Sequence, residues 1–261
     1  MKKVIGNIYI ILIMLFLYLP IVALIVLSFN EAKSMAVFTR ISFRWYEELF
    51  HSSIMLSAII NTFSIAVIAA LIATVVGTMA VLGISAMRSK TEGTLLAINN
   101  IPLLNADIVT GISLMLFFLI LNIPRGYATI LFSHATFCIP YVILSVRPRM
   151  NRNTDKLFEA ALDLGATNRY AFRKIVLPEL RPGIMTGFLL SFTMSVDDFI
   201  ITYFTRGAGI NTISTLIYSQ VKVGIRPSLF ALSTIVFAIA LIVLIIVNIR
   251  QEHVERIRFS K

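Results

Sequence analysis

The segment "EAALDLGATNRYAFRKIVLPELRP", residues Glu159–Pro182, differs sharply in composition from the sequence on either side of it. It is densely charged, whereas long uncharged and mostly apolar runs precede and follow it. Apolar residues make up 58% of the 261 positions and charged residues 14%, compared with roughly a quarter in ordinary soluble domains. A soluble fold of this length would need more polar side chains to cover its surface. We therefore predict an integral membrane protein in which this segment is a loop.

Mostly apolar runs long enough to cross a bilayer as helices occur six times. They are Ile5–Phe29, Ser57–Met87, Leu103–Leu121, Tyr127–Val146, Gly183–Thr205 and Ser228–Asn248. The second is longer than a bilayer requires, which predicts tilt or a protruding end. The first follows "MKK", but its apolar core is too long for a signal peptide, so it is predicted to be a span. The expected fold class is all-α: a polytopic membrane protein with six transmembrane helices, forming a single domain over residues 1–261.

The distribution of lysine and arginine predicts the orientation of the chain in the membrane. With a cytoplasmic N-terminus, the segments inside the cell hold 16 of these residues and the segments outside hold 7. The positive-inside rule favours this orientation over its inverse. Both termini and the loop of residues 147–182 are therefore predicted to be cytoplasmic. Basic loops beside lipid also explain the net charge of +10, so we expect no nucleic-acid partner.

Catalytic and cofactor motifs are missing from the sequence. It contains no HExxH, no GxSxG and no glycine-rich phosphate-binding loop ending in Gly-Lys-Ser/Thr. Cys138, the single cysteine, lies in the fourth predicted span and is expected to be a packing residue. His134 lies in the same span, where it is either a functional group or, as we predict, a hydrogen-bonding residue between helices. We therefore expect no enzyme activity and no cofactor on this chain, and any nucleotide hydrolysis must come from another chain.

The charged loop is predicted to form two short helices joined by a turn. Three residues are candidates for the N-cap of the first helix: Asn153, Thr154 and Asp155. Leu157, Phe158, Ala161 and Leu162 would form its apolar face, and Gly165 suits the left-handed residue that stops it. Thr167 or Asn168 would cap the second helix, which Pro178 is expected to end. Such a surface, with apolar and charged residues side by side, would dock a protein partner; the alternative is a solvated basic loop.

These residues resemble a known motif. Glu159-Ala160-Ala161, followed at fixed spacing by Gly165 and then by Ile175-Val176-Leu177-Pro178, is similar to the EAA motif of MetI-like (type I) ABC-importer permeases. The six predicted spans, and "FRWYEELF" after the first of them, extend the resemblance over nearly the whole chain. In that family the motif forms coupling helices that sit in a cleft of the ATPase subunit. The resemblance implies this role for Glu159, Ala160, Ala161, Gly165, Leu177 and Pro178.

The same resemblance implies partners and a location. Permeases of this kind often work in pairs of two different chains, together with two copies of an ABC ATPase and a periplasmic binding protein. ATP and Mg would then be bound by the ATPase and not by this chain. The chain would be half of a pathway across the bacterial inner membrane, in contact with membrane lipid.

Adjacent acidic residues, Asp197 and Asp198, lie inside the fifth predicted span. A carboxylate at that depth costs on the order of 3 kcal/mol or more unless it faces water, protein or a cation. In a regular helix Asp198 shares one polar stripe with three other residues, Ser191, Ser195 and Thr202. We therefore predict that Asp198 and this stripe face the transported substrate, with Asp197 beside them; a local break in the helix would let both carboxylates point inward.

Two further residues are candidates for the pathway. Asp107 supplies a third carboxylate near the start of the third span, although it could instead act there as a helix cap. Trp45 could contact a cation or anchor the chain at the membrane interface.

Acidic groups and hydroxyls along a pathway favour a cationic substrate. The resemblance, which includes "SFTMSVDDFIITYF", extends to permeases of spermidine/putrescine importers, so a polyamine-binding protein would be the periplasmic partner. The preference between the two polyamines is left open. The alternatives are a permease for another substrate class and a cation-coupled secondary transporter.

Overall fold

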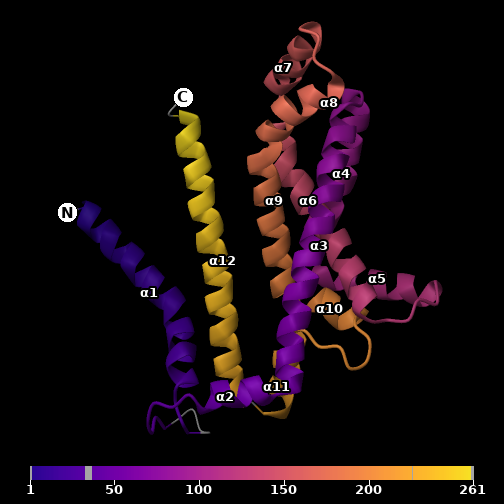
Figure 1. Cartoon of the computed structure of the whole chain (residues 1–261). Helices are drawn as coiled ribbons and strands as arrows, with labels where there is room; N and C mark the ends of the chain where they lie inside the picture. The colour runs from indigo at the N-terminus through magenta and orange to yellow at the C-terminus, as the bar shows by residue number, and fades with distance from the viewer. Residues whose placement is uncertain (1, 33–36, 225, 260–261) are drawn as a thin grey trace. The chain divides into compact units, whose positions relative to one another are not determined.

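The computed structural model describes residues 2–32, 37–224 and 226–259. Over these residues the chain consists of helices and short connections, apart from one isolated bridge between Asn30 and Ile41. The chain divides into two compact units (Figure 1). One comprises Met1–Leu56 together with Leu216–Lys261, and the other is Ser57–Thr215.

The first unit contains α1 (Lys2–Ser28), α2 (Arg44–His51) and α12 (Ser228–Phe259), and α12 contacts both α1 and α2. The connection after α1 is held by polar contacts. The Trp45 indole N–H donates to the backbone carbonyl of Asn30 at 2.6 Å, and the hydroxyls of Ser28 and Tyr46 are 2.7 Å apart. The apolar side chains along the middle of α1 are exposed, as expected of a helix that faces lipid or another membrane helix.

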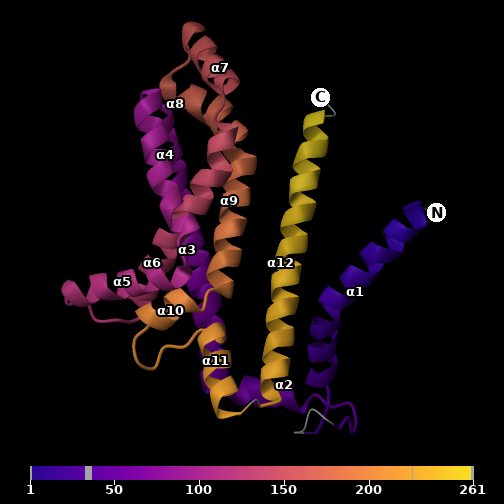
Figure 2. The same cartoon turned by 180° about the vertical axis from the view of Figure 1, so that it is seen from behind.

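The second unit begins within α3 (Ser53–Ser85) and ends within α11 (Ile213–Val223). The elements between them are α4 (Ser89–Leu104), α5 (Asp107–Ile120), α6 (Tyr127–Val146), η1 (Arg147–Arg149), α7 (Arg152–Asp163), α8 (Asn168–Ala171), η2 (Phe172–Val176), α9 (Leu177–Asp197) and α10 (Ile200–Thr205). Helices α6 and α9 lie side by side in both views (Figures 1 and 2). The buried apolar core is centred on α6, where Phe137, Val142 and Val146 belong to it.

Glycines allow the helices of this unit to approach α6 closely. Gly183 and Gly187 of α9 have the GxxxG spacing that is common where membrane helices touch. A Cβ atom on Gly183 would lie 2.8 Å from the carbonyl oxygen of Ser145, and one on Gly187 would lie 3.1 Å from Cα of Val142. From the other side, a Cβ on Gly77 of α3 would lie 2.8 Å from the Val142 side chain. Because these contacts include backbone atoms, α6 and α9 can pack this closely only without side chains there.

Every predicted span coincides with helical structure. Within the described residues, four helical runs are long and apolar enough to cross a membrane: Tyr9–Ser28, Ser53–Ser85, Tyr127–Arg149 and Asn168–Asp197. The bent pair α4 and α5 would make a fifth span if counted as one, and Ser228–Ile242 is a shorter apolar helical stretch. Helix α3 has 33 residues, which confirms that the second predicted span is longer than a bilayer requires. The count of six spans stays a prediction.

Two of the predicted spans are interrupted. The third was expected to run from Leu103, but α4 ends at Leu104 and α5 starts at Asp107 with a bend of 103° between them. The extended backbone of Asn105 and Ala106 makes this bend. For the fifth span the sequence left open a regular helix or a local break, and the structure has the break, because Asp198 is extended (ψ 128°) and separates α9 from α10.

Candidate functional site

The first helix of the charged loop, α7, starts earlier than expected. Its N-cap is Asn151, whose Oδ1 accepts hydrogen bonds from the backbone N–H groups of Asn153 (3.0 Å) and Thr154 (3.1 Å). The prediction that Asn153, Thr154 or Asp155 caps this helix is therefore wrong. An asparagine side chain reaches the second and third N–H groups of the helix that follows it, so the cap lies just before Arg152.

The end of α7 is as predicted. Gly165 has φ +86°, and its N–H donates to the carbonyl of Leu162 at 2.9 Å. The N–H of Ala166 donates to the carbonyl of Ala161 at 3.0 Å, which completes a Schellman motif. Thr167 then caps α8 by accepting from the N–H of Tyr170. The prediction that Gly165 is the left-handed stop is confirmed, and of the two residues predicted to cap the second helix, Thr167 is the cap.

Pro178 does not end the second helix. The helical run continues from Asn168 through η2, which is a π-helix, into α9 and on to Asp197. The N–H of Leu177 donates to the carbonyl of Phe172, five residues earlier. This wider turn places Pro178 in the first turn of α9, where its missing N–H is not needed. The second helix of the charged loop and α9 therefore form one continuous helical run.

The motif residues lie mainly on the exposed side of the loop. Glu159, Ala160, Gly165 and Pro178 are exposed and Ala161 is half-buried, while Leu177 is 39% exposed. The opposite side of α7 points inward, where Phe158 packs against the apolar core and Thr154 is buried. Leu157 was expected on that inner face but is 56% exposed.

An ion pair joins the loop to another part of the same unit. The Arg147 guanidinium binds the carboxylate of Glu92, with Nε 2.9 Å from Oε1. Nη1 of the same arginine donates to the carbonyl of Met150 at 2.7 Å. Glu92 lies in the first turn of α4, so the contact connects the start of α4 with the entry to α7. Sequence reasoning did not find this pair, because its members are 55 positions apart.

A buried polar network surrounds the break between α9 and α10. The two ring nitrogens of His134 lie 2.6 Å from Oγ of Ser195 and 2.9 Å from Oγ1 of Thr202. Its Nε2 is also 3.3 Å from Oδ2 of Asp198. The expectation that His134 is a hydrogen-bonding residue between helices is confirmed.

Asp198 caps the short helix after the break. Its side chain is 6% exposed and accepts hydrogen bonds from the N–H of Ile201 (3.2 Å) and from the N–H and hydroxyl of Thr202 (2.8 and 2.9 Å). These bonds satisfy N–H groups that a helix start leaves unpaired. A carboxylate with this many partners can stay buried. The break is therefore held in place by Asp198 itself.

The serines and threonine of the predicted stripe share one face, but that face is turned toward α6. Ser191, Ser195 and Thr202 are all buried. Ser191 donates through Oγ to the carbonyl of Cys138 at 3.4 Å, and the Cys138 thiol donates to the carbonyl of Ser191 at 3.4 Å. Cys138 is a packing residue at this interface, as predicted. Within this chain the stripe contacts protein, which differs from the expectation that it faces the substrate.

A different face of α9 is exposed, and Asp197 belongs to it. Thr186, Leu190, Thr193 and Asp197 recur at intervals of four, three and four residues and are all exposed, so they form one stripe along the helix. Sequence reasoning missed this stripe because it is less polar than the buried one. The helical spacing of these four residues, which ends at Asp197, could have indicated the stripe.

Asp107 and Trp45 lie in different units. Asp107 is exposed. It is the first residue of α5, and the N-cap position before it is occupied by Ala106. Trp45 is buried, and the Arg44 guanidinium lies 5.2 Å from its ring centroid. The functional roles of both residues stay predictions.

Residues 92–257 match the family model described as a binding-protein-dependent transport system inner membrane component. The chain belongs to this family. It is therefore a membrane-spanning subunit of a transport system and not an enzyme.

Relatives in the family are similar over most of this permease. It is 35% identical over 240 residues to the spermidine/putrescine transport system permease protein PotC of Haemophilus influenzae, covering 91% of this chain and 93% of the relative. It is 37% identical over 228 residues to the putrescine transport system permease protein PotI of Escherichia coli, covering 85% and 81%.

Solved structures support the same fold. A bacterial ABC transporter that imports the acidic polysaccharide alginate matches with a TM-score of 0.67 and 20% identity, covering 98% of this chain and 95% of that one. A bacterial alginate ABC transporter in complex with a periplasmic protein bound to an alginate pentasaccharide matches with a TM-score of 0.68 at 19% identity. At this identity the match shows the fold alone.

Proposed function

We propose that this chain is a permease subunit of an ATP-driven importer that carries the polyamines spermidine and putrescine across the bacterial inner membrane. The observation that carries the proposal is 35% identity to a spermidine/putrescine permease over 91% of the chain. The lysine and arginine distribution supports cytoplasmic termini. The preference between the two polyamines is expected to lie with the periplasmic binding protein.

The exposed side of α7 is the proposed docking surface for the ATPase. Glu159 and Ala160 lie there with two exposed leucines, Leu157 and Leu164, which are 56% and 90% exposed. Exposed leucines on a charged loop are typical of a surface that a partner covers. Because α7 contacts η2 and the helical run continues from Asn168 through η2 into α9, a movement of this surface would be transmitted into the membrane. Two ATPase copies, holding ATP and Mg, would serve this chain and a second homologous permease.

The proposed substrate contact within this chain is Asp197. Its carboxylate is exposed at the end of α9, where a second permease would complete the pathway. An ammonium group about 4 Å away would be attracted by ~1–4 kcal/mol, depending on the local dielectric. Asp107, exposed at the start of α5, is a second candidate contact.

The buried residues of the predicted pathway receive a different role. We propose that Asp198, Ser191, Ser195 and Thr202 shape the break that presents Asp197, because their polar atoms bind protein groups. Trp45 would hold the segment after α1 through its bond to Asn30.

Co-purification and stimulated ATP hydrolysis test the proposal. Affinity-tagged chain should be isolated with a second permease and an ATPase, and polyamine-loaded binding protein should raise ATP hydrolysis by the complex. A stable lone protein, whose uptake persists without ATP while an ion gradient is clamped, would support a secondary transporter instead. If ATP hydrolysis were stimulated by a loaded sugar- or anion-binding protein and not by the polyamine-loaded one, the chain would belong to an importer of another substrate class.

A further inference from the structure

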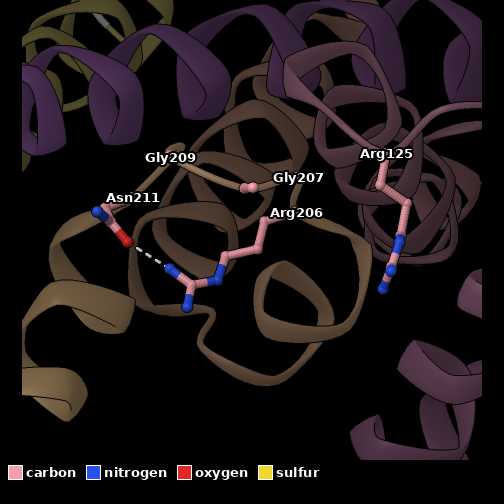
Figure 3. Close-up of a pocket in the computed structure, with 6 residues that line it drawn as sticks. Arg125, Arg206, Gly207, Gly209 and Asn211 are labelled. Atoms are coloured by element: carbon pink, nitrogen blue, oxygen red, sulfur yellow. Dashed lines mark hydrogen bonds between the residues drawn. The ribbon is translucent and has the colours of Figure 1, made fainter.

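A pocket of about 470 Å³ lies where the loop before α6 meets the segment between α10 and α11 (Figure 3). All of its lining residues belong to the unit Ser57–Thr215. They are Arg125, Arg206, Gly207, Ala208, Gly209 and Asn211. Two arginines and no carboxylate therefore line it.

The two loops that form the pocket are fixed against each other through their backbones. A Cβ atom on Gly207 would lie 2.2 Å from the carbonyl oxygen of Arg125, so only glycine permits this approach. The Thr129 hydroxyl at the start of α6 lies 2.8 Å from the carbonyl of Thr205 and donates to it. The Asn61 side chain donates to the carbonyl of Asn211 at 3.1 Å. The positions from which the arginines extend are thus set by the fold.

Among the residues that the structure describes, no acidic side chain forms an ion pair with Arg125 or Arg206. Arg206 donates through Nη1 to the side-chain oxygen of Asn211, and its guanidinium lies 5.7 Å from the ring centroid of Tyr203. Arg125 is exposed, and in Figure 3 its side chain stands apart from that of Arg206, which extends toward Asn211. The ion pairs of the described residues involve other arginines, Arg40 and Arg147, and His134. Two guanidinium groups in one concave site favour an anionic ligand, and arginine matches a carboxylate with paired hydrogen bonds.

We propose that this pocket binds an acidic side chain of the periplasmic binding protein and so forms part of its docking site. The inference rests on the proposed function, because it takes the outer orientation of residues 121–127 and 206–212 from the lysine and arginine distribution. Polyamines are cations, which the pocket would repel, so the transported molecule is not its ligand. A binding-protein-dependent system requires a soluble partner on that side. Opposite charges at such an interface set the rate and the specificity of docking.

Charge reversal at Arg125 tests the proposal. The assembled complex would be placed in nanodiscs of neutral phosphatidylcholine, and its Kd for the cognate spermidine-loaded binding protein would be measured by interferometry. Arg125→Glu should raise that Kd at least tenfold, and Arg125→Lys should raise it much less. Arg226→Glu is the matched control: it makes the same charge change in another segment predicted to lie outside, and Kd should stay within twofold of wild type. Arg206→Gln is a second probe, read together with the melting temperature because Arg206 also binds Asn211.

Phosphatidylglycerol nanodiscs distinguish a protein carboxylate from a lipid phosphate. If the arginines bind the protein partner, the loss of affinity appears in both lipids and the dependence of Kd on salt becomes flatter in the variants. A loss that appears only with phosphatidylglycerol would assign the pocket to anionic lipid and overturn the proposal. Unchanged Kd in Arg125→Glu and Arg206→Gln would also overturn it. Failure of the wild-type complex to bind any binding protein would instead refute the proposed function.

Discussion

Neutralising the two adjacent aspartates one at a time should impair transport for two different reasons, which the melting temperature distinguishes. In the structure Asp197 is exposed and Asp198 is buried with three hydrogen-bond donors around it. We therefore expect Asp197→Asn to impair transport while the melting temperature of the complex stays unchanged. Asp198→Asn should lower the melting temperature, and transport would fall as a consequence.

The expected size of the Asp198→Asn effect follows from its contacts. An asparagine oxygen can replace Oδ2 and accept from Thr202, but its NH₂ group would then face the N–H of Ile201, which now donates at 3.2 Å. One hydrogen bond to a charged acceptor is lost, at a cost of ~1.5–3 kcal/mol. That cost corresponds to a melting temperature lower by several degrees.

For Asp197→Asn, loss of the ~1–4 kcal/mol attraction to an ammonium group corresponds to at least about a fivefold lower rate of uptake. Uptake of radiolabelled spermidine into proteoliposomes and a thermal-shift assay on the same preparations measure both quantities. Asp197→Glu, which keeps the charge, is the control for transport. Wild-type uptake by Asp197→Asn together with an unchanged melting temperature in Asp198→Asn would refute the reasoning.

Three further substitutions test the proposed ATPase-docking loop and the helix packing. Gly165→Leu forces a branched residue to φ +86°, at ~1–2 kcal/mol, and should abolish binding-protein-stimulated ATP hydrolysis while membrane insertion, followed by fractionation, stays normal. Gly183→Ala places a Cβ 2.8 Å from the backbone oxygen of Ser145 and should destabilise the chain by ~1–3 kcal/mol. Gly93→Ala, whose Cβ meets open space inside α4, should leave the melting temperature unchanged or raise it, because alanine favours a helix over glycine. Glu92→Gln weakens the contact to Arg147 and should reduce stimulated ATP hydrolysis without preventing co-purification of the ATPase, and equal stimulation would show that this ion pair does not position the loop.

Much of the fold could be predicted because it depends on local signals. Hydropathy marks each helical span, and the left-handed Gly165 and the capping Thr167 are signalled by single residues whose backbone preferences are strong. The breaks within the helices are harder to predict from the sequence. The break at Asp198 depends on His134 and Thr202 meeting across two helices, and no helical periodicity records such a contact.

Predictions for the candidate site fell short for the same physical reason. A polar stripe on α9 predicts that Ser191, Ser195 and Thr202 share a face, but it does not tell whether that face meets substrate or α6. The cap of α7 was placed too late because several consecutive residues there can cap a helix and the choice depends on geometry. The pair of Glu92 and Arg147, like the GxxxG contact of α9 with α6, becomes visible only when distant segments are brought together.

ATP-driven uptake of polyamine by the reconstituted complex tests the central claim most directly. Proteoliposomes containing this chain, its partner permease and the ATPase would be loaded with ATP or with a non-hydrolysable analogue and given radiolabelled spermidine with the binding protein outside. We predict accumulation of spermidine only with hydrolysable ATP inside, reduced by excess unlabelled putrescine or spermidine and unaffected by alginate, sulfate or maltose. Equal accumulation with the analogue, or no accumulation of either polyamine by a complex that hydrolyses ATP, would contradict the account.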